Sequence, residues 1–202
     1  MAYLQILNLD GDRIVRNPDG PPVLMDAGSD VEIIATEGDT FTRLDIIMHD
    51  DTPGPDCGFD SLSIDLTASI SILNADNDDP GGVATGNRIH VDDDEGNPIQ
   101  IGAILYADRV AIFVDFLPSA TKHQVEQLIR AITYADMSGR SGSTSKPPIR
   151  IFLDSSNTDG TLDGTSAIVT IADGVEGADE DETFTARLGD PACGDRLNGR
   201  GG

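Results

Sequence analysis

The chain has 202 residues, of which 38% are hydrophobic and 4% aromatic, and it contains no Trp. Its 36 Asp and Glu against 13 Lys and Arg give a formal net charge of −23. This charge excludes nucleic acid as a partner, because phosphate is repelled rather than exchanged for counterions. No segment is apolar over the length of a membrane span. We therefore expect a domain whose core consists of Val, Ile and Leu with few aromatic side chains.

Short β-branched segments predict strands along most of the chain. Apolar and polar residues alternate in several of them, as at Leu62, Ile64 and Leu66, which is typical of antiparallel sheets with one buried face. Turn residues separate the segments, so we predict an all-β fold, an antiparallel β-sandwich, over residues 1–173. The strand candidates are 3–9, 22–27, 30–36, 41–49, 61–73, 87–93, 98–105, 109–116, 149–154 and 166–173.

One segment predicts a short helix, at about 121–135. Thr121 and Gln124 have the spacing of a capping box at its start. One apolar stripe follows at helical spacing and is expected to pack on the sheet: Val125, Leu128, Ile129 and Ile132. The opposite face is expected to be solvated, with Lys122, Glu126, Gln127 and Arg130.

The last part of the chain, residues 174–202, is acidic and rich in Gly, with one candidate strand at 183–188. It has too few apolar residues to form a core of its own. We expect a C-terminal arm or linker that orders only against a partner.

Asp residues concentrate in loops rich in Gly, Asn and Pro. A short carboxylate beside free backbone carbonyls offers the oxygen ligands that Ca²⁺ prefers, and the alternative is that Asp and Asn simply favour turns. Recurrence of the pattern in five loops, at 8–12, 49–56, 74–82, 91–97 and 154–164, favours calcium at some of them. The candidate ligands, expected to share one pole of the sandwich, are Asp10, Asp12, Asp154, Asn157, Asp159 and Asp163.

Catalytic motifs are missing from the sequence. It has no G-x-S-x-G elbow, no H-E-x-x-H, no P-loop and no dinucleotide fingerprint, so we expect no enzyme. Cys57 and Cys193 have no Cys or His neighbour at metal-ligand spacing, which excludes zinc. Whether these two cysteines pair in an oxidising compartment is left open.

Several segments together carry a family resemblance: "NLDGD" (8–12), "SATKHQVEQLIRAITYAD" (119–136), "IRIFLD" (149–154) and "GTSAIVTIAD" (164–173). Their order resembles the cadherin-like repeat of large bacterial calcium-dependent surface adhesins and of repeats-in-toxin proteins. The most specific part runs from Val125 to Tyr134. The resemblance implies a cadherin/immunoglobulin-like sandwich in which the helix lies in a crossover between sheets. The stretch at 35–60 is longer than its equivalent in the family.

Three functions follow as hypotheses. The first is a calcium-binding, extracellular structural or adhesive module without catalytic activity. The second is a self-assembling subunit of a filament or surface layer, formed by strand addition between copies. The third is a carbohydrate-binding module, ranked lower because the chain has no Trp and three Tyr.

The expected partners are neighbouring copies or tandem repeats of the same protein, or a cell-surface polysaccharide, with neither nucleic acid nor membrane insertion. We expect an extracellular or cell-surface location. The start of the sequence lacks the basic and apolar segments of a cleaved signal. The chain is therefore expected either to be a piece of a longer protein or to leave the cell without such a signal.

Overall fold

The computed structural model describes residues 3–15, 20–28, 30–48, 60–66, 69–76, 79–93, 95–136 and 148–172. Cys57, Cys193 and the predicted arm at 174–202 lie outside these residues.

Within the described residues the chain forms thirteen strands and one helix. The first seven strands are β1 (Gln5–Leu7), β2 (Arg13–Val15), β3 (Val23–Leu24), β4 (Glu32–Ile34), β5 (Thr40–Met48), β6 (Asp60–Ile64) and β7 (Ile70–Leu73). They are followed by β8 (Arg88–Asp92), β9 (Pro98–Ala107), β10 (Ala111–Phe116), α1 (Lys122–Arg130), β11 (Ile132–Asp136), β12 (Ile149–Ser156) and β13 (Leu162–Ala172).

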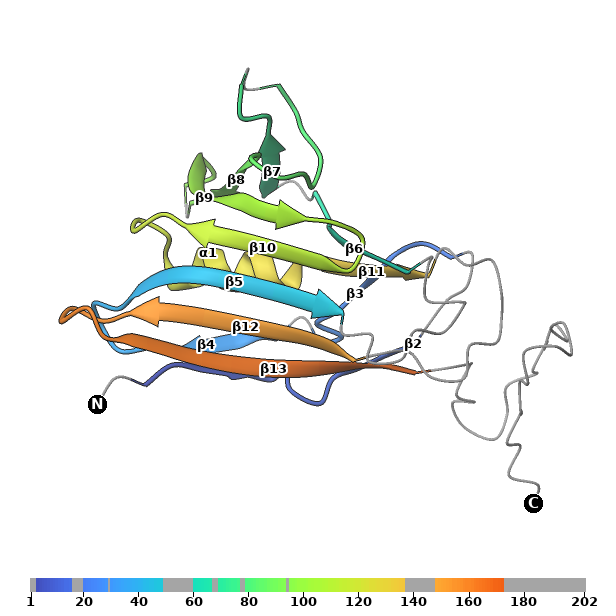
Figure 1. Ribbon diagram of the computed structural model, residues 1–202, viewed down its shortest axis with the longest axis horizontal. Helices are drawn as coiled ribbons and strands as arrows, with labels where there is room; N and C mark the ends of the chain where they lie inside the picture. The colour runs from blue at the N-terminus through green and yellow to red at the C-terminus, as the bar shows by residue number, and fades with distance from the viewer. Residues whose placement is uncertain are drawn as a thin grey trace, which may run out of the picture.

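Eight strands form the main sheet, in the order β2-β13-β12-β5-β10-β9-β8-β7. A two-stranded sheet, β1-β4, and a three-stranded sheet, β3-β11-β6, make up the second layer together with α1. In Figure 1 the main sheet faces the viewer and α1 lies behind it. The predicted all-β sandwich with one short helix is confirmed. Its strand pairs are antiparallel apart from β2 and β13, which run parallel.

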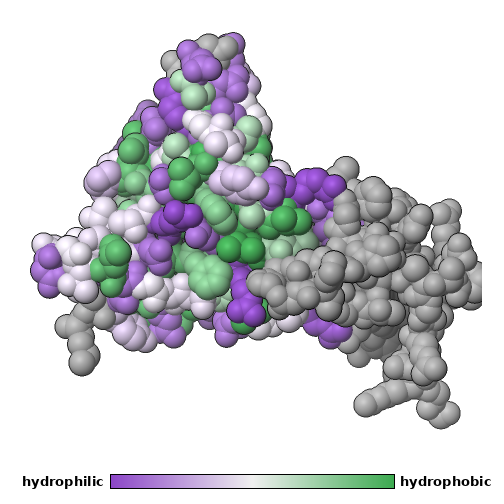
Figure 2. All heavy atoms as spheres, in the orientation of Figure 1, coloured by the Kyte–Doolittle hydropathy of each residue, from purple (hydrophilic) through white to green (hydrophobic). Residues whose placement is uncertain are grey.

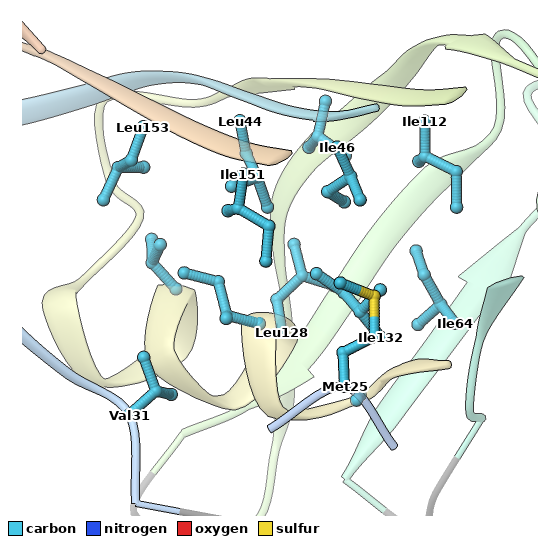
Figure 3. Packing of buried hydrophobic residues seen from close by; sticks show 14 of the residues in the cluster. Met25, Val31, Leu44, Ile46, Ile64, Ile112, Leu128, Ile132, Ile151 and Leu153 are labelled. Carbon is cyan, nitrogen blue, oxygen red and sulfur yellow. The ribbon is translucent and has the colours of Figure 1, made fainter. Parts of the chain in front are cut away.

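The core lies between the two layers. Alternation in β12 and in β5 from Leu44 to Met48 points every second side chain inward, as the period of a strand requires, and these side chains are buried. Figure 3 shows Leu44, Ile46 and Ile151 of the main sheet facing Leu128 of α1 and Ile132 of β11. The core is built from branched aliphatic side chains, as the composition predicted.

The helix begins where it was predicted. The Thr121 hydroxyl accepts a hydrogen bond from the Gln124 amide at 3.3 Å, and the Gln124 side chain accepts one from the Thr121 amide at 3.0 Å. These two bonds are the predicted capping box. Val125, Leu128 and Ile129 are buried, as expected for the apolar stripe.

The helix ends earlier than predicted, at Arg130 rather than near residue 135. Ile132 is buried as expected, but it belongs to β11, where it lies opposite Ile64 of β6. The β-branched and aromatic residues Ile132, Thr133 and Tyr134 suit a pleated, half-buried surface better than a helix. The prediction extended helical spacing into a strand because Ile132 satisfied both patterns.

The polar face of the helix is not solvated throughout. Glu126 is buried, and one of its carboxylate oxygens accepts a hydrogen bond from the Ile33 amide at 2.8 Å. Arg130 donates to the Val31 carbonyl at 2.6 Å. These side chains cover the edge of β4 that does not pair with β1.

Two further boundaries differ from the prediction. The candidate at 61–73 divides into β6 and β7, which belong to different sheets. The last strand begins at Leu162, four residues earlier than predicted, because residues 162–166 continue the pairing with β12.

Candidate functional site

Asp10 and Asp12 lie in the turn between β1 and β2, beside β13. The Asp10 carboxylate accepts a hydrogen bond from the Ile168 amide at 2.9 Å, and Gly11 donates to the Ile168 carbonyl at 2.9 Å. The Asp12 carboxylate accepts from the Ala27 amide at 3.1 Å. Both carboxylates therefore fix the turn to other parts of the fold.

Two carboxylates that the sequence did not single out lie near Asp12. Burial raises the pKa of Asp12, the Ala27 amide lowers it in part, and the charges of Asp26 and Asp30 raise it further. Asp26 is almost fully buried, and it accepts hydrogen bonds from the amides of Asp30 and Val31 at 3.2 and 3.0 Å. Negative charge thus accumulates around Asp12.

Asn157 and Asp159 lie in the turn between β12 and β13, where their side chains bond the turn itself. The side-chain oxygen Oδ1 of Asn157 accepts from the backbone amides of Asp159 and Thr161, at 3.2 and 2.9 Å. The Asp159 carboxylate accepts from the hydroxyl and the amide of Thr161. These two bonds lower the pKa of Asp159, and the bond from the hydroxyl is the larger cause.

The two remaining candidates lie on the strands that flank this turn. Asp163 accepts a hydrogen bond from the amide of Gly164 at 3.0 Å. Asp154 lies on β12 directly opposite Arg43 of β5, and its charge is among the causes that raise the pKa of Arg43.

The structure does not bring the six candidate calcium ligands together. Asp10 and Asp12 contact β13 near Ile168 and Thr170. Asp163 lies five residues before Ile168 on the same strand, a distance of about 17 Å. Within the described residues, no three or more His, Cys, Asp or Glu side chains form a group arranged to hold a metal ion. Calcium binding stays a prediction.

Other acidic loops show the same local bonding. Asp93 accepts from the amides of Glu95 and Asn97 at 3.0 and 2.8 Å, and the Asn97 amide is the largest cause that lowers the pKa of Asp93. Asp108 accepts from the amides of Val110 and Ala111 at 2.9 and 2.8 Å. Such bonds are the physical reason why Asp favours turns, so many of these carboxylates have a structural role in their own loops.

A different feature stands out on the outer face of the main sheet, which Figure 2 shows from the front. Hydrophobic residues gather near the middle of this face, among polar ones. Alternation along β12 and β13, together with a bulge in β9 at Leu105, leaves several large apolar side chains between 36% and 46% exposed, namely Leu105, Tyr106, Phe152 and Ile168. The sequence predicted alternation, but it did not predict which apolar side chains share this face.

Aromatic and charged side chains form a connected group on this face. The rings of Tyr106 and Phe113 lie 5.4 Å apart between centroids. The Arg43 guanidinium lies 5.1 Å from the centre of the Phe113 ring, and its Nε donates to Asp45 at 2.6 Å. The Tyr106 hydroxyl donates to Asp108 at 2.6 Å, and this bond is the largest cause that raises the pKa of Tyr106.

Comparisons with protein-family models, with curated proteins and with solved structures found no match. The resemblance to a cadherin-like repeat therefore stays a hypothesis. The sandwich architecture is observed directly in the structure. The one helix that the structure describes, with nine residues, is too short to cross a membrane.

Proposed function

We propose that the chain is a non-catalytic structural or adhesive β-sandwich module that contacts its partner through the outer face of the main sheet. The proposal places the module outside the cell or on its surface. The observation that carries it is the group of half-exposed apolar side chains on that face, including Tyr106, Phe152 and Ile168. Contiguous apolar surface on a soluble domain marks interaction sites more often than single exposed residues do.

The layer arrangement supports a role for this face. The inner face of the main sheet packs on α1 and the two small sheets, whereas no described strand or helix covers the outer face. A sheet face that is exposed to solvent and binds nothing is expected to carry polar side chains at its outward positions. Here large apolar residues occupy outward positions on β9, β12 and β13.

An adhesion assay tests this function. Beads coated with the protein are applied to a surface coated with the same protein or with isolated bacterial cell walls, and detachment under flow is measured. The paired change Phe152→Asp and Ile168→Asp should abolish retention, because it places charge in the contact face. The control Glu37→Lys changes an exposed residue outside the main sheet and should leave retention unchanged. Equal retention of wild type and the paired variant would contradict the proposal.

Calcium belongs to the proposal as an expected stabilising ligand. The accumulation of negative charge around Asp12 supports it, because a bound cation would relieve the repulsion from Asp26 and Asp30. Extracellular modules bind calcium with dissociation constants of about 10⁻⁴–10⁻³ M. Calorimetric melting in millimolar CaCl₂ should give a higher Tm than in EGTA, and MgCl₂ serves as the control. An unchanged Tm in CaCl₂ would remove calcium from the proposal.

A second candidate function, self-assembly by strand addition, has its own observation. β13 pairs with β2 only over Thr170–Ala172, and Asp10 and Gly11 bond Ile168. No described strand pairs with this edge between Leu162 and Ala167, and an unpaired edge can accept a strand from another chain. Sedimentation velocity should then show concentration-dependent assembly that Ser166→Lys weakens, since charge on an edge opposes pairing. A monomer at every concentration would contradict assembly.

A further inference from the structure

The group of aromatic and charged side chains on the outer face supports a more specific partner. We infer that Tyr106, Phe113 and Phe152, with Arg43 and Asp45 between them, form a binding platform for a neutral oligosaccharide or polysaccharide chain. The inference rests on the proposed adhesive function, for which it names the class of partner.

Strand register places the aromatic residues in one row across the sheet. Phe113 of β10 lies opposite Tyr106 of β9 on one side and opposite Asp45 of β5 on the other. Asp45 in turn lies opposite Phe152 of β12. The row therefore crosses four neighbouring strands and spans about 14 Å, since neighbouring strands lie about 4.8 Å apart. An extended ligand lying across the strands can contact the exposed rings of Tyr106 and Phe152 at the two ends of the row.

Two rings of the row, those of Tyr106 and Phe113, are held in place. The hydroxyl of Tyr106 is fixed by Asp108, which is itself bonded to the amides of Val110 and Ala111. Phe113 packs between the Tyr106 ring and the Arg43 guanidinium. Tyr106 is nevertheless 43% exposed, and Phe152 is 36% exposed. Ordering a side chain before its ligand arrives lowers the entropic cost of binding.

The polar groups beside the rings match a hydroxyl-rich ligand. Arg43 supplies donors, and the carboxylates of Asp45, Asp115 and Asp154 supply acceptors, all on the same face. A sugar hydroxyl both donates and accepts hydrogen bonds, so it can bond to either kind of group. Apolar surface combined with a few placed polar groups is the usual composition of a binding site for a small ligand.

The charges of the protein favour a neutral polysaccharide over the other possible partners. Arg43 is paired with Asp45 and also lies near Asp115 and Asp154, so the charges around it are net negative and disfavour an anionic polysaccharide. The net charge of −23 also repels such a polymer, and it opposes face-to-face association of two copies. Peptides usually bind in a groove or along a sheet edge, whereas this row lies on the open face of the sheet.

Affinity electrophoresis provides the test. The protein is run in native gels that contain one neutral polysaccharide each: hydroxyethyl cellulose, laminarin, galactomannan or soluble starch. Gels with alginate test the anionic class, and gels without polymer give the reference mobility. We expect at least one neutral polysaccharide to retard the wild-type protein and alginate to have no effect.

Single substitutions test whether the retardation depends on the aromatic residues of the row. Tyr106→Ala and Phe152→Ala should each weaken binding about tenfold or more, because each removes an exposed aromatic ring from the contact. Leu162→Ala is the matched control, because Leu162 is an exposed apolar residue at the far end of β13. Tyr106→Phe keeps the ring but loses the bond to Asp108, and it should weaken binding by less than Tyr106→Ala. Thermal melting of each variant checks that the fold is intact.

Three outcomes would overturn the inference. They are no retardation by any neutral polysaccharide, equal retardation of wild type and the folded alanine variants, and retardation by alginate alone. If retardation is absent while bead retention depends on Phe152 and Ile168, the adhesive function stands and its partner belongs to another class. If retention also fails to depend on these residues, the proposed function fails as well.

Discussion

The carboxylate of Glu126 on α1 accepts a hydrogen bond from the amide of Ile33 in β4, 93 residues earlier in the chain, at 2.8 Å. One helical turn later, Arg130 donates to the carbonyl of Val31 at 2.6 Å. One acceptor and one donor, spaced at i and i+4, thus bond the free edge of β4 as a neighbouring strand would. Unpaired strand edges invite association with other chains, so α1 protects the edge as well as filling the core.

Substitution of Glu126 tests this relationship. Glu126→Ala leaves the buried Ile33 amide without an acceptor, which should lower the free energy of unfolding by about 1–3 kcal/mol. Glu126→Gln keeps a side-chain oxygen and should cost less. Urea unfolding measures both, with His123→Ala as the control, since His123 is an exposed residue on the same helix. A loss for His123→Ala as large as for Glu126→Ala would show that the hydrogen bond is not the cause.

The apolar stripe of the helix gives a second prediction. Leu128 is fully buried, facing the main sheet (Figure 3). Leu128→Ala should lower the free energy of unfolding by about 2–5 kcal/mol, the usual range for removing a large core side chain. Leu162→Ala removes the same atoms at a position that is 73% exposed, and it should change stability by no more than about 0.5 kcal/mol. Similar losses for both variants would contradict the observed packing.

Ser155 of β12 gives a prediction of the opposite sign. Its hydroxyl is buried and has no hydrogen-bond partner within the described part of the chain. A buried polar group without a partner costs about 1–3 kcal/mol. Ser155→Ala should therefore leave stability unchanged or raise it by up to that amount, as measured by urea unfolding. The neighbouring change Ser156→Ala, at a partly exposed position, is the control, and a clear loss for Ser155→Ala alone would show that the hydroxyl has a partner.

The pKa shifts of two aspartates, Asp12 and Asp159, predict opposite effects of pH on the stability of the fold. The folded state raises the pKa of Asp12, so the ionised form costs stability, and this cost appears as the pH rises through that pKa. Measured in EGTA, Asp12→Asn should raise the Tm at pH 7 and have little effect near pH 3. The Asn oxygen can still accept the bond from Ala27.

Asp159 has a pKa shift of the opposite direction to that of Asp12. Its pKa is lowered in the folded state, so its ionised form stabilises the fold, and this contribution is lost as the pH falls through the lowered pKa. Asp159→Asn should lower the Tm at pH 7 and leave it unchanged at low pH. Shifts of the same sign for Asp12→Asn and Asp159→Asn at pH 7 would contradict this assignment.

The sequence predicted the local features of the fold well. Alternation identified strands such as 41–49 and 109–116, and the Thr121–Gln124 pair located the start of the helix to within a residue. These signals work because they depend on neighbours within a few positions of the chain. The end of the helix was misplaced because Ile132 continues the apolar spacing of the helix, and only its pairing with Ile64 of β6 assigns it to a strand.

The candidate sites were harder to predict, for a physical reason. Asp10 and Asp159 look alike in sequence, each beside Gly in a loop. One bonds the distant strand β13 and the other bonds its own turn. The aromatic row was not predicted because Tyr106, Phe113 and Phe152 come together only through the strand order β9-β10-β5-β12. The low aromatic content argued against a carbohydrate platform, but topology gathers three of the rings on one face.

The parallel pairing of β2 and β13 has a consequence for how the domain bears load. Arg13, Ile14 and Val15 lie beside Thr170, Ile171 and Ala172, and the Thr170 amide also donates to the Asp12 carbonyl at 2.8 Å. Tension that enters through the residues before β2 and leaves through those after β13 pulls the two strands in opposite directions along their length. Their hydrogen bonds are then sheared together instead of opening one after another, so the contact resists until several bonds fail at once.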